Sequence, residues 1–391
     1  MVTQISQIGF LLLVAALIAI LTRRLRMPYT VGLVLGGMGL SFMPLRLDLT
    51  LTKDLIYSLF LPPLVFEAAL YIGWRELRQD LPVVGLLASL GVLLAAALTA
   101  AGMHLLVHWG WGAAAAFGVL IAATDPVSVI ATFREAGVRG RLRLLVEAES
   151  LLNDGTAAVL FVAAVGLAAG GAGDLLEVIA TLLLSMGGGA LCGAALGFGF
   201  MFLAGRTSDR LVEISFTTLS AYGSFFVAEH FHLSGVLAAL TAGLVTGNYR
   251  SQGHIAKSSR DTIESFWEYV AFLANSLIFL LIGTREAQQH FGGIGLAVLA
   301  AIALVTLGRA LAIYPLCALF NRSSLRVTAA HQHVLFWGGL RGALALALAL
   351  GLPPDFPQRD SIVTVTFGVV AFSIFAQGLT MTPLLRRLGQ L

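Results

Sequence analysis

The sequence has few charged residues for its length. Asp, Glu, Lys and Arg make up 12% of the 391 residues, about half the share found in soluble globular domains, whereas hydrophobic residues make up 58%. The mean hydropathy is +0.89. One soluble core cannot use so much apolar surface, so the composition indicates an all-α polytopic membrane protein.

Cysteine is also scarce. Cys192 and Cys317 lie inside apolar runs without CxxC spacing, which argues against a disulfide framework and against a cysteine metal site. The net charge is only +3, and no basic cluster is interleaved with exposed aromatic residues. We therefore expect membrane lipid to surround the protein, and we expect neither a cofactor nor a nucleic-acid partner.

Windows of mainly apolar residues predict about thirteen transmembrane helices. The predicted spans are 5–22, 29–42, 54–73, 82–106, 111–132, 143–168, 175–204, 211–230, 233–247, 263–284, 292–320, 329–351 and 361–385. The first run is followed by arginines and not by a small-residue cleavage site, so we interpret it as a retained span and not as a signal peptide.

Basic residues alternate between the connections of these spans. Eighteen of the 24 Lys and Arg residues lie in odd-numbered connections or at the C-terminus, and four lie in even-numbered connections. Positive charge is retained on the cytoplasmic side of a membrane. We therefore predict a multi-pass protein of the plasma (inner) membrane, with its N-terminus outside and its C-terminus in the cytoplasm.

Two predicted spans are interrupted in their middle. Thr124-Asp125-Pro126 breaks the fifth, because proline lacks a backbone donor and disfavours helix at the residue before it, and Gly338-Gly339-Leu340-Arg341-Gly342 breaks the twelfth. Thirteen spans divide into two sets of six around one linker, and each break falls in the fifth helix of its set. This predicts inverted six-helix repeats with two unwound crossing helices, spans 5 and 12, which meet at a midplane site.

The sixth span carries polar residues through an apolar run, in LVEAESLLNDGTAAVLF from Leu145 to Phe161. Ser150 and Asp154 are four residues apart and share one helix face, while Glu149 and Asn153 share a neighbouring face. Charge inside a membrane is costly and is usually kept for function.

Several of these groups suit a small alkali cation. Asp154 and Ser150 offer hard oxygen ligands, and the break at Thr124 offers a hydroxyl and freed carbonyls. Glu67 in the third span is a further intramembrane carboxylate. A carboxylate that binds a cation can bind a proton instead, and this competition is enough for exchange.

Charged residues at the breaks have expected partners. Asp125 and Arg341 are placed to neutralise half-helix ends of opposite sign. Arg341 is too costly to bury alone, and Glu149, on the face away from the proposed ion ligands, is its predicted partner.

Other features have simpler interpretations. Gly187, Gly188, Gly189, Gly193 and Gly197 in the seventh span predict close helix packing. His331 and His333 precede the break in the twelfth span, where interfacial histidines are ordinary, although they could tune a response to pH.

Two other functional classes are open to this pattern. An intramembrane aspartyl enzyme using Asp125 and Asp154 would need two carboxylates that share a proton, but the GxGD setting is absent. An ion channel would need a repeated filter loop, and none is visible. Both fit less well than a transporter.

The sequence resembles the monovalent cation:proton antiporters of the NhaP and NHE branch of sodium/proton exchangers. The resemblance spans essentially the whole chain, in the family's order. It is carried by FLPPLVFEAAL, ATDPVSVIA, ESLLNDGTA, ESFWEYVAFLANSLIFLLIG and FWGGLRGALALALAL.

The resemblance implies a non-enzymatic secondary antiporter that exchanges Na+, with Li+ and K+ as other candidates, for H+ by alternating access. A K+-selective antiporter is the alternative. Asp154 would be the ion and proton carboxylate and Ser150 a ligand, with Thr124 binding through its backbone and Asp125 through water or the half-helix end. Glu67 would be a further site carboxylate. In this family Asn at position 153 goes with electroneutral exchange.

The family also implies a homodimer. A dimerising part, about 1–80 and 175–290, would hold still while a core part, about 81–174 and 291–391, moves. In this arrangement Asp154, Ser150, Thr124 and Asp125 belong to the core part and Glu67 to the dimerising part.

Overall fold

The computed structural model describes the chain except for residues 1, 26, 43–50, 126–128, 131–132, 134–136, 171–174, 208, 250–256, 290–292 and 391. The α-helices are α1 (Val2–Leu25), α2 (Tyr29–Ser41), α3 (Leu61–Leu70), α4 (Trp74–Leu86), α5 (Val92–Val107), α6 (Trp111–Leu120), α8 (Arg141–Ala168), α9 (Leu175–Ala204), α10 (Arg210–Thr218), α11 (Ser224–His230), α12 (Gly235–Tyr249), α13 (Lys257–Glu286), α14 (Gly295–Ala318), α15 (Ala329–Trp337), α16 (Ala343–Leu350), α17 (Arg359–Phe372) and α18 (Leu379–Arg387).

Short π-helical turns join some of these helices into longer rods. They are η1 (Leu55–Phe60) before α3, η2 (Leu87–Gly91) between α4 and α5, η3 (Leu219–Gly223) between α10 and α11, and η5 (Ser373–Gly378) between α17 and α18. Eight of the described rods are long and apolar enough to cross a membrane. Each of the thirteen predicted spans overlaps at least one of the described helices, which confirms the all-α polytopic architecture.

Both predicted interruptions are present. Helix α6 ends at Leu120 and residues 121–125 are not helical, although Pro126 lies outside the described residues. Helix α15 ends at Trp337, and α16 begins at Ala343 after five residues without regular helix. Each crossing segment is therefore split by unwound backbone.

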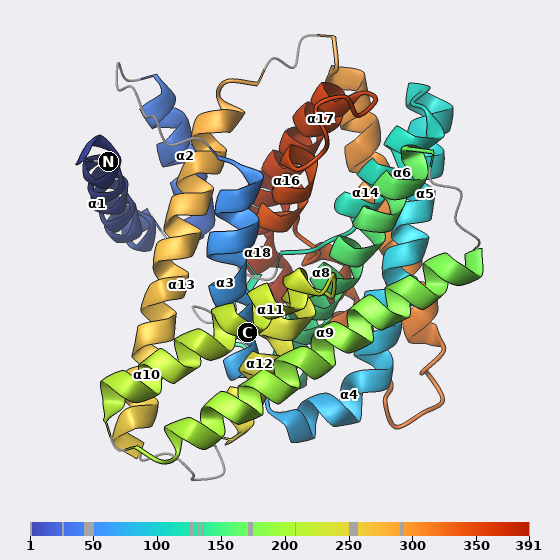
Figure 1. The fold of residues 1–391 in the computed structure, drawn as a ribbon. Helices are drawn as coiled ribbons and strands as arrows, with labels where there is room; N and C mark the ends of the chain where they lie inside the picture. Colours follow the sequence, from blue (N-terminus) through green and yellow to red (C-terminus); the bar gives the residue numbers. More distant parts are fainter. Residues whose placement is uncertain are drawn as a thin grey trace.

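The helices pack in two neighbouring groups (Figure 1). Each of the two large clusters of buried apolar side chains contains residues from both groups. Helix α5 packs on α6, α8 and α14, and α6 packs on α8. The turn η2 contacts α5, α8 and α14, α17 contacts α6 and α14, and α16 joins them through α6, α8 and α17. Helix α13 packs on α2, α1 and α3, while α12 packs on α3 and α9. Figure 1 shows the long helix α9 crossing the front of the view, α13 on the left, and α5 and α6 on the right.

Glycines let α9 approach α12 closely. A Cβ added at Gly189 or Gly193 would overlap backbone oxygens of Ser234 or Ala238, and one at Gly197 would lie 3.1 Å from the Cα of Ala242. Gly188 lies against the side chain of Leu233, whereas Gly187 faces open space. The prediction of close helix packing in the seventh span is thus confirmed for four of its five glycines.

Candidate ion-binding site at the crossed breaks

The two breaks meet in the interior. The backbone N–H of Asp125 donates a 2.7 Å hydrogen bond to the carbonyl oxygen of Leu340, which joins the two unwound segments directly. Unwound backbone at membrane depth must be satisfied inside the protein. The bond fixes the position of each break relative to the other.

The charged residues of the breaks lie at half-helix ends of opposite sign. Arg341 Nη1 donates to the carbonyl oxygens of Ala122 and Ala123, at 2.9 and 3.0 Å, just beyond the C-terminal end of α6. The carboxylate of Asp125 lies against Gly342, the residue that precedes α16. A cation at a helix C-terminus and an anion at a helix N-terminus are both stabilised by the backbone dipoles. The predicted placement of these two residues is confirmed.

The π-helical turn η5 stabilises the second break through hydrogen bonds between Ser373 and the backbone of Arg341. The hydroxyl of Ser373 accepts a 3.0 Å hydrogen bond from the N–H of Arg341 and lies 3.0 Å from the Arg341 carbonyl oxygen, to which it can donate. Such turns often occur at functional sites because they expose backbone positions that a regular helix would close. Here the turn holds the backbone of a buried arginine, whose side chain is then aimed at α6.

Asn153 ties the first break to α8. Its amide oxygen accepts from the N–H of Thr124 at 3.1 Å, and its amide nitrogen donates to Thr124 Oγ1 at 2.6 Å and to Glu149 Oε1 at 3.1 Å. Ser150 Oγ lies 3.0 Å from Thr124 Oγ1, within hydrogen-bonding distance. All four residues are buried, so these bonds position the hydroxyls of Thr124 and Ser150 without help from solvent.

The predicted pair of Glu149 with Arg341 is wrong. Glu149 instead accepts two hydrogen bonds from Arg309 on α14, at 2.7 Å from Nη1 and 2.8 Å from Nη2. Arg309 also donates to the carbonyl oxygen of Leu335 near the end of α15. The planar guanidinium matches a carboxylate at two points, whereas Arg341 uses Nη1 on the α6 carbonyls.

Arg309 is the residue that the sequence analysis missed. It stands alone in the apolar eleventh span, where an arginine needs a partner as much as one in a break does. The cost of burying an unpaired arginine indicated that Arg309 needs a partner. The sequence, however, contained two such arginines, Arg309 and Arg341, for one carboxylate, and it did not show which of them was closer to Glu149.

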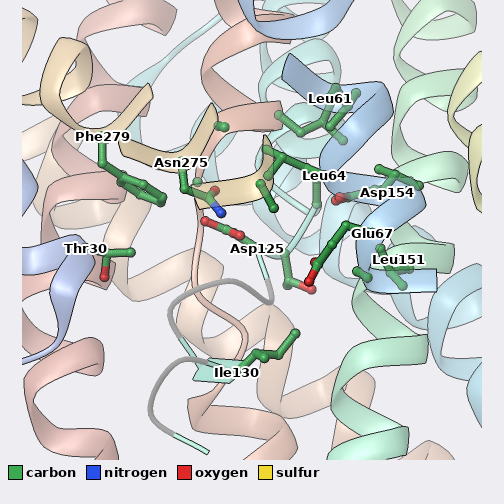
Figure 2. Close-up of a pocket in the computed structure, with 18 of the residues that line it drawn as sticks. Thr30, Leu61, Leu64, Glu67, Asp125, Ile130, Leu151, Asp154, Asn275 and Phe279 are labelled. Atoms are coloured by element: carbon green, nitrogen blue, oxygen red, sulfur yellow. The ribbon is translucent and has the colours of Figure 1, made fainter. Parts of the chain in front are cut away.

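A cavity of about 230 Å³ opens at the crossing (Figure 2). Asp154, Thr124 and Asp125 line it from the core side, and Glu67 lines it from α3. Ser150, Asn153, Glu149 and Arg341 do not line it. The structure therefore brings four of the eight predicted site residues to one cavity and places the others behind its wall.

Asp154 has an unused oxygen in this cavity wall. The residue is 6% exposed, and its Oδ1 is buried without a hydrogen-bond partner in the structure. A buried carboxylate oxygen left without a donor is costly and requires explanation. It can be satisfied by a bound cation or by a proton on the carboxyl group.

Other polar residues face the cavity from the opposite wall. These are Tyr29 and Thr30 on α2, and Glu268 and Asn275 on α13; Figure 2 labels Thr30 and Asn275 among the residues that line the cavity. The motif FLANSL, a polar pair within an apolar span, was the available signal for Asn275. In the described ranges, no three His, Cys, Asp or Glu side chains converge as a metal cluster, so a cation here would depend on hydroxyl, carbonyl or amide oxygens as well as carboxylates.

The two histidines of the twelfth span lie away from this cavity. His333 is exposed and its Nδ1 lies 2.8 Å from the hydroxyl of Tyr314. His331 is half-buried near the start of α15. A role for either in pH response stays a prediction.

Known proteins resemble the whole chain. A family profile described as sodium/hydrogen exchanger, transmembrane, matches residues 11–387. The chain is 39% identical to the Na(+)/H(+) antiporter ApNhaP of Aphanothece halophytica, over 93% of this chain and 70% of that protein. It is 35% identical to the Na(+)/H(+) antiporter NhaH of Halobacillus aidingensis, over 98% and 97% of the two chains.

A solved structure shares the fold. The sodium proton antiporter MjNhaP1 from Methanocaldococcus jannaschii, determined at pH 8, matches over 99% of both chains with a TM-score of 0.76 and 18% sequence identity. At this identity the likeness concerns the fold alone. It agrees with the all-helical polytopic architecture described above.

Proposed function

This chain belongs to the sodium/hydrogen exchanger family and is a secondary antiporter of Na+ and H+, not an enzyme; we propose that the carboxylate of Asp154 is the group for which the two ions compete. One observation carries the proposal. Asp154 is buried in the cavity wall, and its Oδ1 has no hydrogen-bond partner in the structure.

Three other charges of the crossing are already compensated. Arg309 neutralises Glu149, Arg341 lies on the negative end of α6, and Asp125 lies at the start of α16. Asp154 has no such fixed partner. An uncompensated carboxylate in a low-dielectric site favours a counter-cation or a proton, and either ion satisfies it.

The cation ligands follow from the same geometry. Asp154 supplies carboxylate oxygens from α8 and Glu67 from α3, and Thr124 supplies its hydroxyl or the free backbone of the break. Ser150, whose hydroxyl lies 3.0 Å from that of Thr124 behind the cavity wall, is the further proposed ligand. Asp125 acts through water or the half-helix end. Oxygen ligands of this kind suit Na+ first, with Li+ and K+ as the alternatives.

We further propose that exchange is electroneutral and proceeds by alternating access. With one exchangeable charge at Asp154, each cycle carries one cation one way and one proton the other. The core part, about 81–174 and 291–391, would move against the dimerising part, about 1–80 and 175–290, in a homodimer of the plasma membrane. Its N-terminus would lie outside and its C-terminus in the cytoplasm, as the positions of the basic residues favour.

The test is proton movement in sealed vesicles that contain the purified protein. Addition of Na+ outside acid-loaded vesicles should dequench a pH-sensitive dye with the wild type and leave it quenched with Asp154→Asn. Asp360→Asn removes a carboxylate whose side chain is 98% exposed, and it should exchange normally. Normal sodium-dependent proton movement by folded Asp154→Asn protein would refute the proposal.

A further inference from the structure

A second cavity lies on the outside of the helix bundle, away from the ion site. It has a volume of about 390 Å³ and is lined by residues of α14, α15 and α18. Its walls include Tyr314, Phe336, Trp337 and Leu384, and Arg387 lines it as well. We call this cavity the aromatic groove. Its volume is in the range of small-ligand sites, and none of the ion-site residues lines it.

The aromatic groove has fixed walls. Trp337 Nε1 donates a 2.8 Å hydrogen bond to Thr380 Oγ1, which links α15 to α18. The hydroxyl of Tyr314 lies 2.8 Å from His333 Nδ1, which links α14 to α15. The polar tips of both aromatic residues are therefore occupied within the protein. Their rings are half-buried and lie near the ring of Phe336, and the part of each ring that lines the groove is apolar surface open to a ligand.

The groove ends at a cation that the protein does not neutralise. Arg387 is exposed and is the last residue of α18. Within the described residues it makes neither an ion pair nor a hydrogen bond. A guanidinium pairs well with phosphate because its donors match two phosphate oxygens.

The position of the groove fits the membrane surface. The rod from Arg359 to Arg387 is long and apolar enough to cross a membrane, so Arg387 lies where its apolar run stops. Trp and Tyr are enriched at this depth, and basic residues there meet lipid phosphates. The proposed orientation places this end in the cytoplasmic leaflet, which is the more anionic one.

We propose that the aromatic groove binds one anionic phospholipid. Its phosphate pairs with Arg387, and the first part of an acyl chain lies against Phe336 and Leu384. A single interfacial basic residue contributes about 1 kcal/mol toward an anionic surface, which corresponds to a preference of about fivefold. A zwitterionic lipid of the same chain length lacks this advantage because its own cation offsets the phosphate.

The chain supplies its own matched control. Arg386 and Arg387 are adjacent, exposed and equally charged, but only Arg387 lines the groove. Arg387→Gln and Arg386→Gln therefore remove the same charge from the same helix end. Leu384→Trp fills the groove and keeps both arginines.

The experiment counts lipids retained by the full chain in native mass spectrometry, with dioleoyl phosphatidylglycerol and dioleoyl phosphatidylcholine as probes. Wild type and Arg386→Gln should retain one phosphatidylglycerol with a preference of about fivefold. Arg387→Gln should lose that preference, and Leu384→Trp should lose the bound lipid. Melting curves establish whether each variant is folded. If Leu384→Trp does not fold, Arg387→Gln alone decides the proposal.

Three outcomes would overturn the proposal. Equal losses in the two arginine variants would mean diffuse attraction to charge. Equal retention of the two lipids by wild type would mean that the groove is not selective for anionic headgroups. Displacement of the signal by millimolar inorganic phosphate, with no dependence on the acyl chain, would mean a free-anion site.

Discussion

Arg309 on α14 donates two hydrogen bonds, 2.7 and 2.8 Å long, to the carboxylate of Glu149 on α8, and both side chains are almost fully buried. The same guanidinium binds the Leu335 carbonyl of α15, and Glu149 also accepts from Asn153. A chain of contacts thus runs from the end of α15 through α8 to Thr124 in the first break. Through its hydrogen bond with Asn153, the Arg309–Glu149 pair helps to position the residue that precedes Asp154.

This pair predicts a thermodynamic cycle. Glu149→Ala and Arg309→Ala should each destabilise the protein by about 3–5 kcal/mol, because each leaves an uncompensated buried charge. The double variant should lose much less than the sum of the two. Apparent melting temperatures in detergent measure all three. Glu149→Ala combined with Arg341→Ala is the comparison, and it should be much closer to additive; a stronger coupling to Arg341 than to Arg309 would contradict the observed pairing.

The sequence was sufficient to predict the helices, the two breaks and four of the residues that line the cavity. Physical reasons separate what it could show from what it could not. Span lengths, the break at Gly338–Gly342 and the polar faces of α8 are local properties, set by hydropathy and periodicity. The partner of Glu149 is not local. Arg309 and Arg341 each needed an anion or carbonyl oxygens. Only the three-dimensional fold, which brings Arg309 to Glu149 and Arg341 to the carbonyl oxygens beyond α6, decides between them. Asn275 and Thr30 reach the cavity for the same kind of reason, through the packing of α13 and α2.

Gly342 sets the position of Asp125. A Cβ at this position would overlap the carboxylate of Asp125, so Gly342→Ala should push Asp125 away from the start of α16. We expect sodium-dependent proton movement to fall by at least about tenfold, which corresponds to about 1.4 kcal/mol in the transport barrier. Vesicle assays at matched protein density measure this loss.

Gly85→Ala is the control for that substitution. Gly85 lies within α4 and faces open space, so the added methyl meets no neighbour. In a helix interior, alanine is more favourable than glycine by about 1 kcal/mol. This variant should therefore keep full activity and melt at the same or a higher temperature. Unchanged transport by Gly342→Ala would show that Asp125 need not stay where the structure has it.

Competition at Asp154 predicts how Na+ and pH act together. At low pH the carboxyl group of Asp154 is protonated and cannot bind Na+, and at high pH too few protons remain to exchange. The pH profile of activity at fixed Na+ should therefore be bell-shaped. A higher Na+ concentration competes better with protons, and the acidic limb should therefore move to lower pH. Initial rates across pH at several Na+ concentrations measure the shift. An acidic limb that does not move would indicate a separate regulatory proton site, with His331 and His333 as the first residues to substitute.

Charge balance at the crossing predicts that transport does not respond to membrane potential. Glu149 is neutralised by Arg309, and Asn153 beside Asp154 is uncharged, so Asp154 alone exchanges one cation for one proton. A potential contributes about 2.3 kcal/mol per charge per 100 mV, and a cycle that moves no net charge is insensitive to it. Clamping the vesicle potential with valinomycin, under conditions where K+ itself is not transported, should leave the rate of Na+-driven proton movement unchanged.

Glu67 faces the same cavity from α3 and is the residue that could alter this result. A severalfold change in rate when the potential is reversed would mean that Glu67 carries a second proton, and Glu67→Gln should then abolish that response while exchange at Asp154 continues.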